Sequence, residues 1–262
     1  MRAKKVMILG LGIMFAVSMM VGTGCDDGDT GATDTRDSSF TVGEFPKLIV
    51  SNENGNVEIE TSDDQEVHIQ AELVGSDQID YDVWQDGDTI LVDVEIEGSD
   101  TDGVGVNLTI TTPRMTEAII ENSNGYIEAN GIKREARLKT SNGKVLLKNS
   151  DGKFKLRSSN GALEMQNVEG EFDAETNNGN IRFKGEMIPL GANRIVTSNG
   201  AVDIQLENDP SIALEAKTRN GSIDSELPIL ATITESEQLV GSIGDGEAEL
   251  YIRTSNGNIN IS

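Results

Sequence analysis

Few residues in this 262-residue chain are of the types that carry out nucleophilic or metal-dependent catalysis. His68 is the one histidine and Cys25 the one cysteine, so a Ser–His or Cys–His arrangement depends on these two residues alone. A zinc site of the usual kind needs about three or four such ligands. His68 also lies where apolar and polar residues alternate, which favours an ordinary histidine on a strand surface. We therefore expect no catalytic site, no metal site and no cofactor.

Carboxylates are the abundant ionisable groups, with 45 Asp and Glu residues against 21 Lys and Arg, and the formal net charge is −24. Such a surface repels nucleic acid, so no nucleic-acid partner is expected. Paired carboxylates hydrolyse glycosidic bonds in many enzymes, but in so acidic a chain no single pair stands out. A polysaccharide-acting enzyme is therefore the alternative hypothesis. Its groove is expected near residues 228–246, where the chain departs from its repeat.

One short acidic segment has the composition of a calcium loop. Asp100, Thr101, Asp102 and Gly103 resemble its first residues, but the glutamate that would complete the loop is missing at the required spacing. A polar hairpin turn is the favoured interpretation, and weak calcium binding is the alternative.

Cations cluster in one part of this acidic chain, between residues 133 and 157. By strand parity the side chains expected to point outward on adjacent strands are Arg137, Lys139, Lys153, Lys155 and Arg157. These five form a possible patch for an anionic envelope polymer or an acidic protein partner. The alternative is that they pair within the molecule with carboxylates of residues 171–175. We favour internal pairing, because opposite charges commonly face each other between strands.

A short phrase built on Asn-Gly returns along the chain and indicates the elements that position these side chains. The first steps between copies are 18 residues, followed by steps of 21, 21 and 36. The repeated asparagines, expected to form a structural turn ladder, are Asn124, Asn142, Asn160, Asn178, Asn199, Asn220 and Asn256. Apolar and polar residues alternate on both sides of each copy, which predicts an all-β fold of half-buried strands joined by tight turns.

Two folds use this pattern: a parallel β-solenoid (β-helix), and an antiparallel β meander with Asn-Gly hairpins. In a solenoid, residues 18 apart are neighbours, so Lys153, Lys155 and Arg157 lie beside the carboxylates of residues 171–175. A Thr or Ser also recurs two residues before most of the asparagines, where stacked hydroxyls and amides can form ladders along the axis. We therefore favour the solenoid. The 36-residue step is expected to hold two coils, with residues 240–243 replacing the missing Asn-Gly.

The chain divides into four segments. Residues 1–24 combine a basic start, an apolar run and small residues, which predicts a signal peptide of the lipoprotein type, and Cys25 is then the lipid attachment site. Residues 25–39 are an acidic stretch without large apolar residues, expected to be a flexible tether. Residues 40–113 are expected to form a β-rich N-terminal cap or first coils, and residues 114–262 the regular solenoid with 18–21-residue coils.

The repeat also resembles a known family. Pro113, the Ser-Asn-Gly of residues 123–125, the Thr-Ser-Asn-Gly copies and the run from residue 246 to Thr254 are similar to the bacterial putative-adhesin family of β-strand-repeat proteins. The resemblance covers residues 45–262 and implies an exported, right-handed β-solenoid of unknown function. No functional residues are established for that family, so none are implied here.

The first functional hypothesis is a non-catalytic protein of the bacterial cell envelope, held to a membrane by a lipid at Cys25. Its solenoid surface would present weak, repeated contacts to an envelope polymer or protein, for adhesion or assembly. The alternatives are the polysaccharide-acting enzyme and a purely structural spacer.

Overall fold

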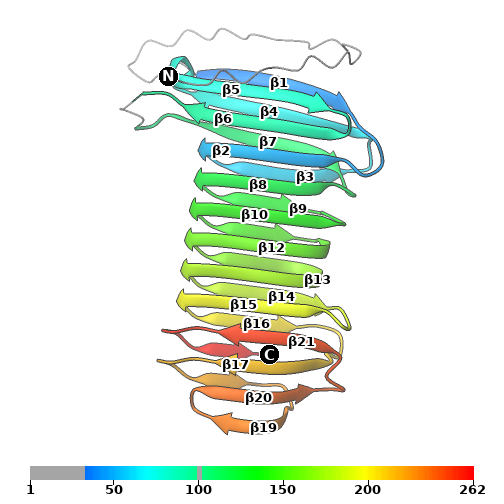
Figure 1. Ribbon diagram of the computed structural model, residues 1–262, viewed down its shortest axis with the longest axis vertical. Coiled ribbons are helices and arrows are strands. Elements are labelled where there is room, and N and C mark those ends of the chain that lie inside the picture. The colour runs from blue at the N-terminus through cyan, green and yellow to red at the C-terminus, as the bar shows by residue number, and fades with distance from the viewer. Residues whose placement is uncertain (1–32, 99–101) are drawn as a thin grey trace, which may run out of the picture.

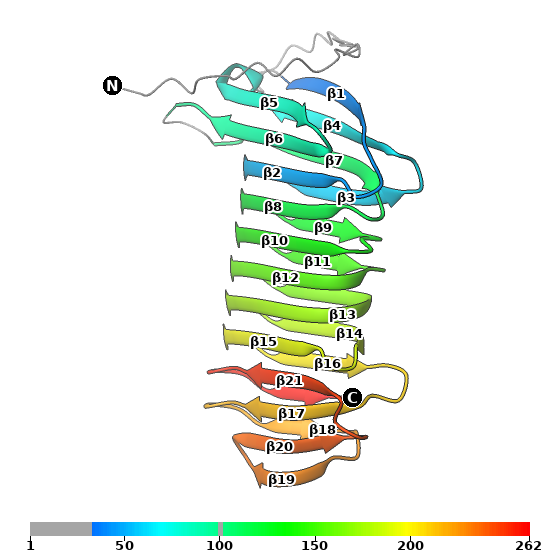
Figure 2. The same cartoon turned by 45° about the vertical axis from the view of Figure 1, so that its right-hand side comes forward.

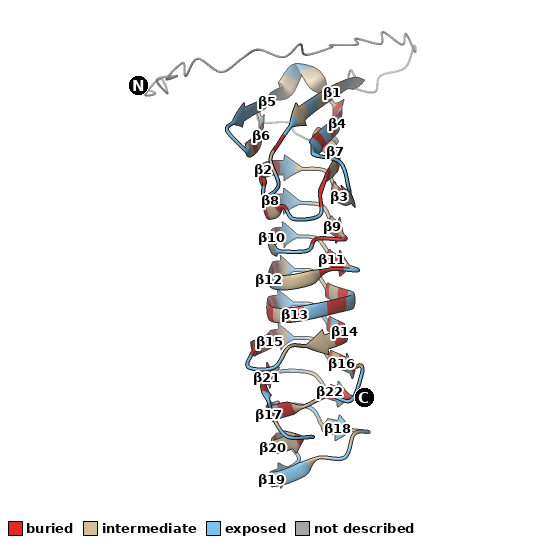
Figure 3. Cartoon of the chain, turned by 90° about the vertical axis from the view of Figure 1, so that its right-hand side faces the viewer, coloured by how far each residue is buried: buried red, intermediate tan, exposed pale blue. Residues whose placement is uncertain are grey.

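The computed structural model describes residues 33–98 and 102–262, and regular structure in these ranges is almost entirely β-strand. The strands form an elongated stack of two facing sheets, seen from the side in Figure 3. We call the sheet nearer the viewer in Figure 1 the front sheet and the other the back sheet. Within the described ranges, no helix is long and apolar enough to cross a membrane.

Each central coil consists of one front strand, an Asn-Gly turn and one back strand. In one such coil, β8 (Glu117–Asn124) turns at Gly125, continues as β9 (Ile127–Asn130) and rounds a corner into β10 (Glu135–Asn142). β10 lies parallel to β8, with Leu138 opposite Ile120, the residue 18 positions earlier. The central strands therefore stack in parallel and in register, as expected of a solenoid, and the meander alternative is wrong for them.

The order of the strands in space follows from their pairing. From one end of the stack to the other, the front sheet contains β5 (Ile79–Asp86), β6 (Thr89–Ile96), β2 (Lys47–Asn54), β8, β10, β12 (Asp151–Asn160), the second half of β13 (Leu163–Asn178), β15 (Ala192–Asn199), β21 (Ala248–Arg253), β17 (Ile212–Lys217), β20 (Gln238–Ile243) and β19 (Leu230–Glu235). In the same direction the back sheet contains β1 (Thr33–Thr41), β4 (Glu66–Val74), β7 (Gly105–Pro113), β3 (Val57–Ser62), β9, β11 (Val145–Lys148), the first half of β13, β14 (Ile181–Met187), β16 (Val202–Leu206), β22 (Ile259–Ile261) and β18 (Ile223–Ser225).

Two coils lie out of chain order. The coil of β2 and β3 lies between β6–β7 and β8–β9, although β6 and β7 come later in the sequence. At the other end the final coil, β21 and β22, lies between β15–β16 and β17–β18, and Figure 2 shows β21 between β15 and β17. The first and last regular coils are thus each held between neighbours on both sides, so neither forms an open edge of the stack.

The ends of the stack differ from the sequence-based expectations. Residues 33–39, expected as part of the tether, form most of β1, which pairs antiparallel with β4. The 36-residue step does not hold two coils. Residues 240–243 belong to β20, which pairs antiparallel with β17 and with β19. Antiparallel strands thus cover the N-terminal end of both sheets and the C-terminal end of the front sheet, whereas the back sheet ends at β18, which is parallel to β22.

The core lies between the two sheets and repeats along the axis. Phe154, Phe172 and Phe183 are almost fully buried and contact one another in sequence, with ring centroids 5.7 Å apart for the first pair and 4.9 Å for the second. Such stacking of equivalent side chains buries apolar surface continuously from coil to coil.

The asparagines of the Asn-Gly turns form one ladder along an edge of the stack. Each of them except Asn54, the first in the ladder, donates a hydrogen bond from Nδ2 to Oδ1 of the asparagine in the adjacent coil, at 2.7–2.9 Å. In spatial order the ladder contains Asn54, Asn124, Asn142, Asn160, Asn178, Asn199, Asn256 and Asn220. The structure therefore brings together all seven expected asparagines, adds Asn54, and places Asn256 before Asn220.

The threonine and serine hydroxyls two residues earlier form a second column, but they do not bond to one another. Each donates to the glycine carbonyl of the adjacent coil, as Thr176 does to Gly161 at 2.9 Å and Ser158 to Gly143 at 3.0 Å. Buried hydroxyls are thereby satisfied at every turn.

Candidate functional site

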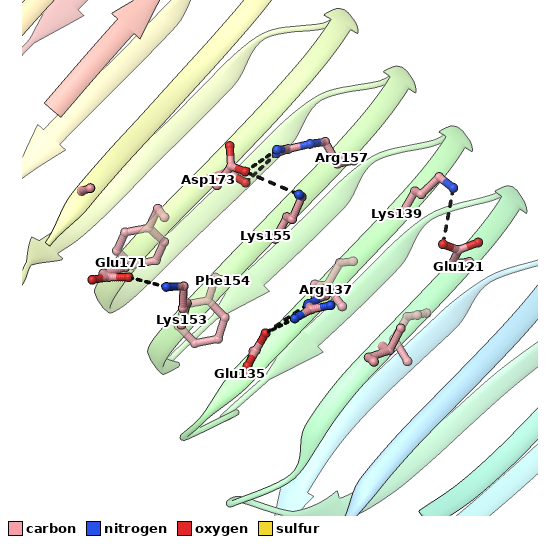
Figure 4. Close-up of a pocket in the computed structure, with 15 residues that line it drawn as sticks. Glu121, Glu135, Arg137, Lys139, Lys153, Phe154, Lys155, Arg157, Glu171 and Asp173 are labelled. Atoms are coloured by element: carbon pink, nitrogen blue, oxygen red, sulfur yellow. Dashed lines mark hydrogen bonds and ion pairs between the residues drawn. The ribbon is translucent and has the colours of Figure 1, made fainter.

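A groove of about 620 Å³ lies across the front sheet, over β8, β10, β12 and the second half of β13 (Figure 4). All five cations of the expected patch, Arg137, Lys139, Lys153, Lys155 and Arg157, line this groove. They point outward because side chains alternate along a strand, and the residues between them, such as Phe154 and Leu156, are buried in the core. The repeat therefore places the cations on one surface.

Three of the cations pair with carboxylates of the next coil, in the register expected from the sequence. Lys153 lies opposite Glu171, with Nζ 2.9 Å from the carboxylate, and Lys155 lies opposite Asp173 at 3.8 Å. Arg157 also contacts Asp173 (Figure 4). The hydrogen bond to Glu171 holds the pKa of Lys153 above its ordinary value.

The other two cations pair on their own side of the groove. Arg137 contacts Glu135 of the same strand at 2.9 Å, and Lys139 contacts Glu121 of β8 at 3.4 Å. Between strands, however, Arg137 lies opposite Lys155 and Lys139 lies opposite Arg157. Cations therefore face cations across β10 and β12, an arrangement that disfavours the pairing of these strands.

Asp173 holds the centre of the charge network. Besides Lys155 and Arg157, it contacts Arg194 of β15 at 3.4 Å, so one carboxylate serves three cations. Partial burial acts to raise the pKa of Asp173, but the hydrogen bond from Arg157 and the three positive charges outweigh it and hold this pKa below its usual value. Glu175 also contacts Arg157 and Arg194, at 3.8 and 2.8 Å, so three cations and two carboxylates meet at this end of the groove.

The sequence of the repeat region matches the model of a protein family. The family model described as Toastrack DUF4097 matches residues 93–262, which is more than half of the chain. The chain belongs to the Toastrack DUF4097 family. The family expected from the Asn-Gly repeat is thus confirmed, although the match starts at residue 93 rather than 45.

Two solved structures illustrate what this Toastrack chain is similar to. One is a putative cell adhesion protein from Clostridium sporogenes, 12% identical, with a TM-score of 0.42 over 87% of this chain and 98% of that one. The other is a putative adhesin from Bacteroides fragilis, also 12% identical, with a TM-score of 0.44 over 87% and 97% of the two chains. No curated protein sequence matches the chain.

A second hollow, of about 390 Å³, lies at the far end of the Toastrack stack, where the enzyme hypothesis expects a groove. Glu235 and Glu237 line it together with Lys217, Arg219 and Arg253. Glu235 is the last residue of β19, and Glu237 lies in the turn between β19 and β20, on the antiparallel hairpin that covers this end of the front sheet. The larger groove, with its clustered cations, is the better-defined surface of the two.

The structure also brings together three residues that the sequence did not connect. Ser39 Oγ lies 2.9 Å from His68 Nδ1, and Asp37 Oδ1 lies 3.8 Å from His68 Nε2. The antiparallel pairing of β1 with β4 places them there, and that pairing was not expected for residues 33–39. In a hydrolase triad the serine contacts Nε2 of the histidine and the aspartate contacts Nδ1, which is the reverse of the arrangement here. This trio is therefore an exposed polar contact between strands.

The remaining expected sites fall at or beyond the edge of the described ranges. Cys25, Asp100 and Thr101 lie outside them, whereas Asp102 and Gly103 lie inside, just before β7. Among the described residues no group of three or more His, Cys, Asp and Glu side chains is placed to hold a metal ion. Lipid attachment and weak calcium binding thus stay predictions from the sequence.

Proposed function

We propose that this protein is a non-catalytic, lipid-anchored component of the bacterial cell envelope that uses the groove on its front sheet to bind an anionic partner, for adhesion or assembly. The observation that carries the proposal is the cluster of cations in that groove, on a chain with a net charge of −24. Repulsion from the rest of the surface steers an anionic partner toward this cluster. The coils are proposed to be right-handed, as the family resemblance implies.

Two cations of the groove stay accessible to an external anion although they pair with carboxylates of the protein. Lys155 is 53% exposed and lies 3.8 Å from Asp173, a carboxylate that Arg157 and Arg194 already contact. Arg137 is 57% exposed, and its partner Glu135 belongs to the same strand. An incoming anion can therefore pair with Lys155 and Arg137 while Asp173 keeps its other contacts, so binding leaves the sheet intact.

The binding proposal is tested with a matched pair of double variants. Arg137→Gln with Lys155→Gln removes two exposed cations from the groove. Arg182→Gln with Lys184→Gln removes an exposed arginine and lysine from β14 of the back sheet, and these also pair with carboxylates. We expect the first variant to bind an acidic polymer about tenfold more weakly at low salt, from about 0.7 kcal/mol per exposed charge, and the second to bind as the wild type does. Equal weakening in both variants would mean that net charge alone governs binding and that the groove is not a site.

The proposed anchor would hold the groove close to a membrane. Since β1 starts at Thr33, the lipid on Cys25 lies within about 30 Å of the N-terminal end of the stack. The groove starts at β8, three strand spacings or about 14 Å from the end strand β5. Lipid labelling of wild type and Cys25→Ala, with protease treatment of intact cells, tests both parts. Labelling that survives the substitution would exclude Cys25 as the anchor, and full protection of the wild type would exclude surface adhesion.

A further inference from the structure

A single line of outward side chains runs along the axis of the front sheet and passes through the groove. At the N-terminal end its members are apolar and lie opposite one another on four adjacent strands: Trp84, Leu91, Ile49 and Ile119. The next strands contribute Arg137 and Lys155, again directly opposite their neighbours. We call this line, from Trp84 to Lys155, the axial row.

The axial row is accessible along its length. Trp84 is 43% exposed, and Leu91, Ile49 and Ile119 are half-buried by their neighbours in the sheet. Ile119 also forms one end of the groove that contains Arg137 and Lys155, so the apolar part leads into the cationic part without a break. With neighbouring strands about 4.8 Å apart, Trp84 and Arg137 are four spacings, or about 19 Å, from each other.

Carboxylates flank the apolar part of the axial row. Asp82 and Asp93 lie opposite each other, two residues along the strands from Trp84 and Leu91 respectively, and point to the same outer surface. They accept hydrogen bonds from hydroxyl groups but repel a further acidic group. A ligand that follows the row therefore needs hydroxyl-rich, uncharged units over β5 and β6 and an acidic unit over β10 and β12.

We infer that the axial row is the binding track for a linear polysaccharide that contains both neutral and acidic sugars and lies along the axis of the stack. This rests on the proposed function and names the chemical class of its ligand. The exposed indole of Trp84 offers a flat, electron-rich surface to the C–H bonds of a sugar ring. Arg137 and Lys155 offer charge-assisted hydrogen bonds to a sugar carboxylate at the other end.

The same observations disfavour other occupants. An anionic membrane would face Asp82 and Asp93 together with Trp84, and those carboxylates would repel it. A uniformly acidic polypeptide would meet the same repulsion beyond β2, so it would engage the groove but not Trp84. The inferred ligand must therefore contact both Trp84 and the cations of the groove.

Trp84 is the one tryptophan of the chain, so its fluorescence reports on the apolar end of the axial row alone. The test uses fragments of partly oxidised cellulose, in which runs of neutral glucose separate single glucuronate units, and polyglutamate as the acidic polypeptide. We expect the oxidised cellulose to bind the full chain and to change the Trp84 emission, and polyglutamate to leave that emission unchanged. Binding of oxidised cellulose without a change at Trp84 would overturn the inference but leave the proposed function standing. Binding of polyglutamate alone would do the same and identify an acidic protein as the partner, whereas no binding of either polymer would overturn both.

Variants separate contact from a general change in folding. Trp84→Ala is expected to weaken the binding of oxidised cellulose about three- to tenfold, measured by calorimetry, whereas Trp84→Phe retains most of it. Phe45→Ala is the control, because Phe45 is 52% exposed but lies before β2, outside the axial row. Equal affinities for wild type and Trp84→Ala, with circular dichroism showing both folded, would overturn the track.

Discussion

The glycines of the Asn-Gly turns are packed against one another, and Gly161→Ala tests how strongly the stack depends on them. The nearest atom that a Cβ at residue 161 meets is the carbonyl oxygen of Gly143 in the adjacent coil, well inside van der Waals contact. The φ angle of Gly161 lies outside the left-handed region, so the clash, and not backbone strain, forbids a side chain here. The two turns must therefore move apart by about 1 Å or more.

That movement acts on hydrogen bonds at their normal length. Asn160 donates to Asn142 at 2.9 Å and Ser158 donates to Gly143 at 3.0 Å, so a shift of this size breaks both bonds. At about 1 kcal/mol for each bond and about 2 kcal/mol for overpacking, less about 0.7 kcal/mol gained by restricting the unfolded chain, we expect Gly161→Ala to lower the free energy of unfolding by about 3 kcal/mol.

The assay is denaturant unfolding followed by circular dichroism and by Trp84 fluorescence. Circular dichroism reports on all strands, whereas Trp84 lies on β5 at one end, so a break in the middle of a stack that is coupled only between neighbours shifts the first signal more than the second. Gly87→Ala is the control, because its φ of +59° is left-handed and no atom lies near its Cβ, which isolates a strain cost of about 1 kcal/mol. If Gly161→Ala lowers the free energy of unfolding by no more than Gly87→Ala does, the close-packing argument is refuted.

Two further predictions concern buried polar groups. Asn122→Thr is expected to raise the free energy of unfolding by about 1 kcal/mol, measured by denaturant titration. The reason is that Asn122 Oδ1 is buried without a partner, whereas other turns have a Thr at this position, which donates to the glycine carbonyl. A loss of stability would contradict this. Burial raises the pKa of Tyr81 to about 12, so the unfolded chain loses this proton first and stability falls by up to about 2 kcal/mol as the pH rises from about 10 through 12. The difference between the absorbance titrations of wild type and Tyr81→Phe should therefore have its midpoint near 12, and a midpoint near 10 would contradict the burial argument.

The central coils could be predicted from the sequence because each position repeats its own environment. Leu138 is apolar for the same reason as Ile120, since the two lie opposite each other in adjacent coils. The charge pairs follow from the same register, and Lys153 faces Glu171 as the 18-residue spacing requires. A repeat of this kind determines together where each turn lies, which side chains of a strand point inward, and which residues of the adjacent coil they face.

The order of the coils could not be predicted by the same reasoning. The repeat copies around Asn256 and Asn220 are chemically alike, so the sequence does not indicate which of the two lies beside Asn199. In the structure Asn256 lies there, 57 residues away in the chain. The choice depends on the hairpin of β19 and β20, which pairs with β17 and occupies the outer end, leaving the final coil the inner position. Such hairpins lack the repeat, so their pairing is not visible in the spacing of the asparagines.

The site shows how the fold and the proposed binding depend on the same register. In-register stacking brings Asp173 beside Lys155, which stabilises the sheet, and it also brings Arg137 beside Lys155, which does not. A sequence selected only for stability would alternate charge along this line of adjacent coils, as it does from Lys155 to Asp173 to Arg194. The apolar residues from Trp84 to Ile119 are likewise left on the outer surface, where they stabilise the core little. A cation pair next to an outward apolar line is therefore better explained by a ligand that contacts both than by folding alone.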